Sequence, residues 1–194
     1  MIDLKPACRR MTDVLAGVDD AQLNDPTPCT EYTVRGLIDH IDEAAQALAG
    51  IARGSAGSDG AAAAPAAESG ATQPDGGRFG DARRESTAQS VRALGDAWGD
   101  PAAWSGVTEA LGVEQTNELW GRIALTEMVV HGWDLAKATG QLYDLPHETL
   151  QACFEHVRAF VPNAPLDGLW GPAVEAPADA PLLDRLVAVT GRHP

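Results

Sequence analysis

The sequence is poor in basic residues. Lysine and arginine together number 14 against 28 aspartate and glutamate residues, so the 194-residue chain has a formal net charge of −14. Proteins that bind nucleic acids or anionic membranes present clusters of positive charge, and no basic cluster interrupts this acidic background. We therefore expect partners that are neither nucleic acid nor membrane.

Cysteines and long apolar stretches are also scarce. The three cysteines, Cys8, Cys29 and Cys153, form no CxxC pair, which argues against a cysteine zinc knuckle and favours a reducing compartment. No segment approaches the roughly 20 apolar residues of a membrane span, and the charged start MIDLKPACRRMTDV lacks the apolar stretch of an export signal. These features predict a cytoplasmic protein.

Signature motifs of several large enzyme classes are missing. The sequence contains no GxSxG elbow, no glycine-rich phosphate-binding loop and no dinucleotide-binding fingerprint. It therefore gives no indication of the acyl, phosphoryl or hydride transfer that these motifs support.

Helical periodicity dominates what the chain does contain. Helices are predicted over residues 3–15, 34–50, 81–98, 118–139, 146–160 and 182–190. A short extended pair is expected between residues 100 and 117. Thr33 is the expected N-cap of the second helix, and Gly140 the expected C-cap of the fourth. Four principal helices with additional C-terminal helices predict an all-α, up-and-down four-helix bundle.

One low-complexity segment interrupts this pattern. The stretch GSAGSDGAAAAPAAESGATQPDGG is made of Ala, Gly, Ser and Pro with few other residues, and it can bury little apolar surface. We expect a loop at about residues 54–80, inserted in a single domain that spans residues 1–194. That length is sufficient for one sizeable core.

A carboxylate and an imidazole share an apolar helix face. Glu127 and His131 lie one helical turn apart in the segment LWGRIALTEMVVHGWDLAKATG. The rest of that face is formed by Trp120, Ala124, Met128, Leu135 and Ala138. Burying an unpaired charge costs several kcal/mol, so we expect this pair to be tied to a partner group, a metal ion or a reaction.

The second helix offers a matching residue, because His40 shares its face with small and aliphatic side chains. Helices of a bundle can bring inward-facing ligands to one point. Two histidines and a glutamate form the ligand set of a catalytic-type zinc or similar divalent site with one open position. The pattern predicts a metal site of His40, Glu127 and His131, with hydrogen-bonded core residues as the alternative. The other histidines, His147, His156 and His193, are expected at the periphery.

Four further residues each have two possible roles. Asp134 either orients a ligand imidazole as a hydrogen-bond acceptor or faces solvent. Cys29 precedes the second helix, whose N-terminus lowers a thiol pKa, although a buried and inert thiol is the simpler interpretation. Val129 and Trp133 form an apolar stripe opposite Glu127 and His131, to be covered by the C-terminal segment or by a second copy in a homodimer.

Three segments carry a family resemblance. TPCTEYTVRGLIDHI, ALTEMVVHGWDLAKATGQ and GPAVEAPADAPLLDRLVAVTGRHP resemble, in this order, three stretches of the DinB-like metal-binding proteins. Within that superfamily they are most similar to the metal-binding domains of mycothiol-dependent maleylpyruvate isomerases. The resemblance spans nearly the whole chain apart from the Ala/Gly-rich loop, and it implies a four-helix bundle carrying one divalent ion.

The resemblance also implies the ligands. The histidine of the family's second helix falls on His40, and the later ligand pair falls on Glu127 and His131. Many DinB-like proteins have histidine at all three places, so Glu127 resembles the mycothiol isomerase variant. This branch implies a mycothiol-type thiolate that adds to an electrophilic carbon of a small substrate. Zinc is the first expectation for the ion, with nickel, iron or manganese as alternatives.

One departure from the family keeps the reaction open. The isomerases continue into a separate C-terminal domain, whereas this sequence ends soon after its bundle, so maleylpyruvate isomerisation itself is not implied. The leading hypothesis is a metal- and thiol-dependent transferase or isomerase. The alternatives are a noncatalytic metal-binding or sensing module, which a fourth protein ligand such as Asp134 would favour, and a structural helical interaction domain. The sequence leaves open whether the protein is an enzyme.

Overall fold

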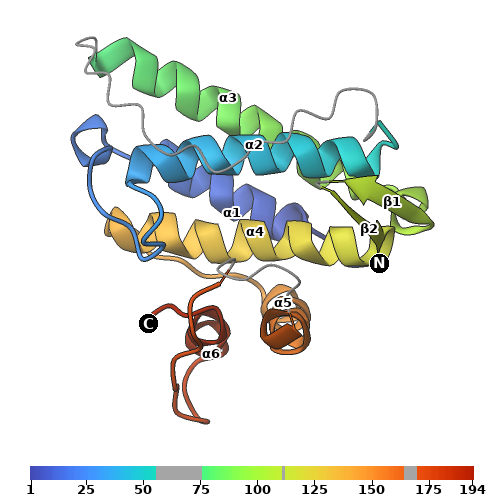
Figure 1. The fold of residues 1–194 in the computed structure, drawn as a ribbon. Helices are drawn as coiled ribbons and strands as arrows, with labels where there is room; N and C mark the ends of the chain where they lie inside the picture. The colour runs from blue at the N-terminus through green and yellow to red at the C-terminus, as the bar shows by residue number, and fades with distance from the viewer. Residues whose placement is uncertain (56–75, 111, 164–169) are drawn as a thin grey trace.

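The computed structural model describes residues 1–55, 76–110, 112–163 and 170–194 (Figure 1). The helices are α1 (Lys5–Ala16), α2 (Val34–Ala52), α3 (Gly76–Ala97), α4 (Asn117–Ala138), α5 (His147–Phe160) and α6 (Leu182–Val189). The strands β1 (Val107–Ala110) and β2 (Val113–Thr116) pair antiparallel between α3 and α4. The predicted all-α class and the short extended pair are both confirmed.

The loop expected at about residues 54–80 lies mostly outside the described residues. At its end, however, α3 begins at Gly76, five residues before the predicted start at Asp81. Glycines are poor helix formers, so the sequence pattern there did not indicate a helix. Once the chain is helical, Arg84 hydrogen-bonds both Asp20 and Asp81.

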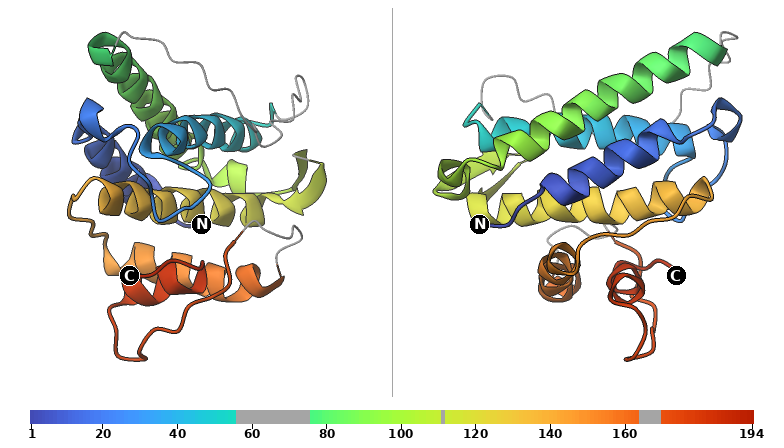
Figure 2. Two further views of the ribbon diagram at one scale, coloured as in Figure 1. Left: turned by 60° about the vertical axis from the view of Figure 1, so that its left-hand side comes forward. Right: turned by 180° about the vertical axis from the view of Figure 1, so that it is seen from behind.

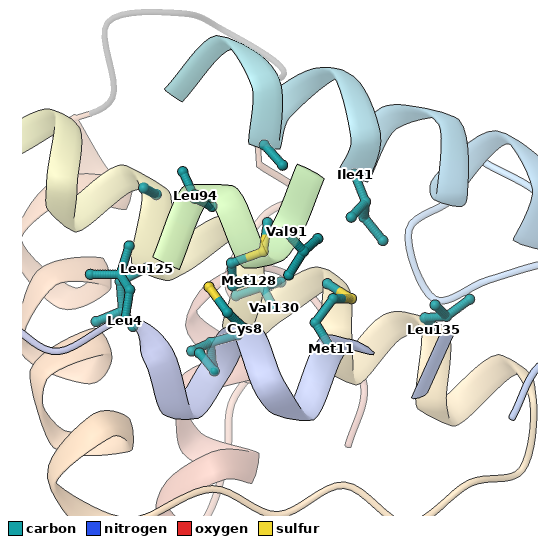
Figure 3. Packing of buried hydrophobic residues seen from close by; sticks show 14 of the residues in the cluster. Leu4, Cys8, Met11, Ile41, Val91, Leu94, Leu125, Met128, Val130 and Leu135 are labelled. Atoms are coloured by element: carbon teal, nitrogen blue, oxygen red, sulfur yellow. The ribbon is translucent and has the colours of Figure 1, made fainter. Parts of the chain in front are cut away.

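Helices α1 to α4 form the main body, in which α1 and α2 each pack against both α3 and α4 (Figures 1 and 2). Figure 3 shows apolar side chains from all four helices meeting between them, among them Met11, Ile41, Val91 and Met128. A polar side chain that enters this region from α2 or α4 is therefore surrounded by apolar groups.

The predicted up-and-down order of the helices is wrong, because α2 and α3 run in the same direction. Arg83 near the start of α3 pairs with Asp39 near the start of α2, with 2.7 Å between Nε and Oδ1. Near the other ends, Arg53 Nη2 donates to the Ala93 carbonyl oxygen at 3.2 Å. Only a short connection forces neighbouring helices to be antiparallel, and residues 53–75 are long enough to return to the starting end.

Local signals fix the start of α2. Thr33 has an extended backbone, and its hydroxyl accepts a hydrogen bond from the Gly36 amide at 3.3 Å. This confirms the predicted N-cap. The cap sets the helical phase, and with it the inward face that carries His40 seven residues later.

The C-terminal segment covers the outer face of α4. Figure 2 shows α5 and α6 on the side of α4 that faces away from α2 and α3. Val129 and Trp133 are buried. Thr126, which helical spacing places on the same face of α4, contacts Cys153 of α5, with 3.7 Å between Oγ1 and Sγ. The position of the C-terminal segment favours the first of the two expected covers.

His156 on α5 differs from the expectation of a peripheral position, because it is buried and stacks on Phe160. Its Nε2 has no hydrogen-bond partner among the described residues.

Among the helices of the described residues, none combines the length and the apolar character needed to span a bilayer.

Candidate metal centre

Three side chains from two helices converge on one point. His40 Nε2 of α2 lies 3.3 Å from Glu127 Oε2 of α4, and His131 Nε2 lies 3.3 Å from the same oxygen. The three atoms all lie within 4.8 Å of one another. The structure thus brings together the three residues that helical spacing singled out, although His40 lies 87 positions before Glu127 in the chain.

The spacing of these atoms fits a small divalent ion. Ligand atoms bound at about 2.0–2.1 Å to a tetrahedral zinc ion lie roughly 3.3 Å apart, which is the separation between Glu127 Oε2 and each histidine Nε2. Two imidazole nitrogens and one carboxylate oxygen also match the chemistry of a catalytic-type zinc site. The residues present therefore fit the ion that the family resemblance implies.

Each imidazole is held through its other ring nitrogen. The Tyr32 hydroxyl lies 3.3 Å from His40 Nδ1, and the two rings stack with 4.9 Å between their centroids. His131 Nδ1 lies 3.0 Å from Asp134 Oδ2. A partner at Nδ1 fixes the ring orientation and leaves the Nε2 lone pair for a metal ion, so both rings are oriented as ligands require.

Charges within the centre are strongly coupled. Burial raises the pKa of the Glu127 carboxyl, but the charge and hydrogen bonds of His131 and His40 outweigh it and hold that pKa well below its ordinary value. Burial likewise lowers the pKa of His131, whereas Glu127 and Asp134 raise it. The net result is a pKa of about 9. The Glu127 carboxylate is therefore anionic over the whole physiological range, whereas His131 would release its Nε2 proton when it binds an ion.

The centre is buried on one side and reachable on the other. The exposed fraction of the side chain falls from 29% for His40 through 15% for Glu127 to 7% for His131. Solvent thus approaches from the His40 side, where Tyr32 lies. A small molecule that approaches the three ligand atoms would come from this side.

Asp134 does not face solvent, since it is fully buried. It binds His131 through Oδ2 and accepts two hydrogen bonds from Arg192, at 3.2 Å from Nε to Oδ1 and at 2.9 Å from Nη2 to Oδ2. With both oxygens engaged, Asp134 is placed to orient His131. The geometry supports the first of its two expected roles.

Cys29 lies close to the centre, and its surroundings raise the pKa of its thiol. Its sulfur is within 4.8 Å of ligand atoms of His131 and Asp134. Burial raises its pKa, and the charge of Arg192 opposes this effect only in part. This direction favours the simpler of the two expected interpretations, a buried and inert thiol, because loss of hydration dominates at the half-buried sulfur.

Two residues at the centre were not predicted from the sequence. Tyr32 holds His40, and Arg192 holds Asp134. Both lie outside the helices, where apolar periodicity carries no information. They do fall within the segments TPCTEYTVRGLIDHI and GPAVEAPADAPLLDRLVAVTGRHP, so the family resemblance is the signal that could have found them.

Comparisons with known proteins identify relatives of the chain. Two uncharacterized proteins, from two strains of Mycobacterium tuberculosis, are each 29% identical over 182 residues, which cover 92% of this chain and 90% of theirs. A crystal structure of a point mutant of mycothiol-dependent maleylpyruvate isomerase has the same fold, with a TM-score of 0.55 at 18% identity. The match covers 79% of this chain and 66% of the isomerase, so the chain spans just under two thirds of that protein's length.

A family model for the mycothiol maleylpyruvate isomerase N-terminal domain matches residues 4–136. The matched stretch contains His40, Glu127, His131 and Asp134, whereas Arg192 lies beyond its end. The chain belongs to the family of mycothiol maleylpyruvate isomerase N-terminal domains.

Proposed function

We propose that the protein binds one divalent metal ion through His40, Glu127 and His131, and uses it with a mycothiol-type thiol as a transferase or isomerase of a small electrophile. The proposal rests chiefly on the convergence of three ligand atoms, with each histidine Nε2 3.3 Å from Glu127 Oε2 and each imidazole held at Nδ1. Zinc is the ion that this donor set favours first, and nickel, iron and manganese accept the same ligands.

The chemistry follows from what the ion and the chain each supply. A divalent ion lowers the pKa of a thiol ligand, so that a thiolate is available near neutral pH. The residues of the chain orient the ligands and exclude water from the His131 side. Mycothiol, when bound, would supply a sulfur nucleophile for an activated carbon–carbon double bond of the substrate: a carbon–sulfur bond would form, the π bond would break, and the neighbouring carbon would take up the proton that the thiol had lost. Elimination would reverse these changes and return the thiol.

The nucleophile is assigned to the small molecule rather than to the protein. Cys29 is the cysteine beside the centre, and burial raises its pKa. A thiol of this kind is mostly protonated at neutral pH and attacks poorly. An external thiol that enters from the exposed His40 side is neither buried in the protein nor subject to the raised pKa of Cys29.

A noncatalytic metal-binding module is less well supported by the geometry. That alternative requires a closed ligand shell with a fourth protein ligand, for which Asp134 was the candidate. Both Asp134 oxygens are engaged by Arg192, and one of them also by His131. With Asp134 engaged in this way, the three-ligand set would leave the open position that catalytic sites need.

The first test is metal content and affinity in matched variants. We expect one divalent ion per chain in purified protein, and loss of this ion in His40→Ala, Glu127→Gln and His131→Ala. His147→Ala is the control, because His147 is exposed at the start of α5, away from the centre. Elemental analysis and zinc titration against a chromogenic chelator give the readout.

The second test concerns the thiol. Mycothiol is expected to raise the melting temperature of the metal-loaded protein, and to leave that of His131→Ala unchanged. Metal binding without any response to mycothiol would favour the noncatalytic module. Wild-type protein that binds no divalent ion at micromolar concentration would overturn the proposal.

A further inference from the structure

A buried ion pair links the end of the chain to the centre. Arg192 follows α6, and its side chain is 6% exposed, while that of Asp134 on α4 is 0% exposed. The guanidinium binds both carboxylate oxygens, and its Nη1 also donates to the Thr190 carbonyl oxygen at 2.8 Å. Packing alone does not account for such a pair, since apolar residues of similar volume often stabilise a core as well or better.

The backbone around Arg192 is built to hold this side chain inward. Gly191 has φ +85°, a conformation that favours glycine, and a Cβ at this position would lie 2.8 Å from backbone atoms of Gly171. The Arg192 amide donates to the Val187 carbonyl oxygen at 3.0 Å. The guanidinium also lies over the Trp170 ring, 5.5 Å from its centroid. Arg192 is therefore fixed from several sides before it meets Asp134.

One oxygen connects the ion pair to the candidate ligand. Asp134 Oδ2 lies 2.9 Å from Arg192 Nη2 and 3.0 Å from His131 Nδ1. The bidentate contact with a planar guanidinium fixes the plane of the carboxylate. Because Oδ2 is shared, the direction in which His131 points its Nε2 depends on where Arg192 holds Asp134.

We propose that Arg192 is a positioning residue of the metal centre, acting through Asp134 on His131. The inference rests on the proposed function, because it assumes that His131 binds an ion. It goes beyond that function by making the C-terminal segment, which lies outside the family-matched residues 4–136, part of the centre. Groups that orient metal ligands in this way typically change metal affinity when they are replaced.

The experiment compares arginine variants by zinc titration against a chromogenic chelator. Arg192→Met keeps much of the side-chain length but removes the charge and the hydrogen bonds, and we expect zinc affinity to fall about 10- to 100-fold. Arg192→Lys keeps the charge but cannot make the bidentate contact with Asp134. We expect its zinc affinity to lie between those of the wild type and Arg192→Met. Arg185→Met is the matched control, because Arg185 is also a C-terminal arginine over an aromatic ring, that of Phe154, but has no contact with Asp134.

The melting temperature of each metal-free variant separates positioning from stability. A positioning role predicts that Arg192→Lys loses zinc affinity even where its metal-free melting temperature equals that of the wild type. If Arg192→Met does not fold, the lysine variant decides. Wild-type zinc affinity in Arg192→Lys, or an equal loss in Arg185→Met, would overturn the inference while leaving the proposed function intact. A wild-type protein without zinc affinity would overturn both.

Discussion

At the scale of single residues, His156 is the histidine whose burial should affect stability most directly. Burial, and then the positive charge of Arg122, lowers its pKa from 6.5 to about 4. Between these values the unfolded chain binds a proton that the folded chain does not. The free energy of unfolding therefore carries the full contribution of neutral His156 above pH 6.5, and loses it as the pH falls towards 4.

His156→Phe is expected to flatten this acid dependence. Phenylalanine keeps a ring that can stack on Phe160 but takes up no proton, so roughly 2–3 kcal/mol of stability should no longer be lost between pH 6.5 and pH 4. Urea unfolding at a series of pH values measures the effect. His147→Phe, at an exposed position, serves as the control and should keep the wild-type slope. An unchanged slope in His156→Phe would contradict the assignment.

The same scale shows which site residues the sequence can and cannot indicate. Glu127 and His131 are visible because two polar groups interrupt a regular apolar face. Arg192 is not visible in this way, since it follows a short helix and meets a residue 58 positions earlier. His156 was misjudged because the burial of α5 depends on its packing against α4 and α6, which no local pattern of α5 encodes.

At the scale of elements, the ends of α4 and α6 offer a matched pair of glycines. Gly140 after α4 has φ +69° and Gly191 after α6 has φ +85°. A Cβ at Gly140 would meet nothing within 4 Å, whereas at Gly191 it would meet the backbone of Gly171. Alanine is strained by about 1–2 kcal/mol in either left-handed conformation, but only the second substitution must also move the backbone that precedes Arg192.

Gly140→Ala is therefore expected to lower stability by about 1–2 kcal/mol without changing zinc affinity. Gly191→Ala is expected to lower stability further and to weaken zinc binding, because displacement of Arg192 releases Asp134. Chemical denaturation and zinc titration of both variants provide the measurements. Equal zinc affinities in the two variants would show that the backbone at Gly191 does not act on the centre.

Helix directions were beyond what the sequence could predict. Periodicity located the helices, and Thr33 was correctly placed as the cap of α2. The direction of α3 relative to α2 depends on the connection between them, whose low-complexity composition favours neither a tight turn nor a return crossing. The contacts of Arg83 with Asp39 and of Arg53 with Ala93 show that the two helices run in the same direction. Such pairs between distant residues are not encoded in either helix alone.

At the scale of the whole molecule, the candidate centre joins parts of the chain that are far apart. His40 comes from α2, Glu127 and His131 come from α4, and the pair of Asp134 with Arg192 extends the connection to the segment after α6. The unfolded chain cannot hold these groups at one point, so an ion bound by them stabilises the folded state.

Zinc at about 100 times its dissociation constant should therefore add about 2.7 kcal/mol to the free energy of unfolding. For a chain of this length, that corresponds to a rise of roughly 5–10 °C in melting temperature. Thermal unfolding of the wild type with zinc or with a chelator measures the shift, and hydrogen exchange should slow in both α2 and α4. In His131→Ala the shift should vanish, whereas His147→Ala should retain it. A full shift in His131→Ala would mean that zinc stabilises the protein from another place, because with His131 truncated only one residue of α4 would face His40 across the centre.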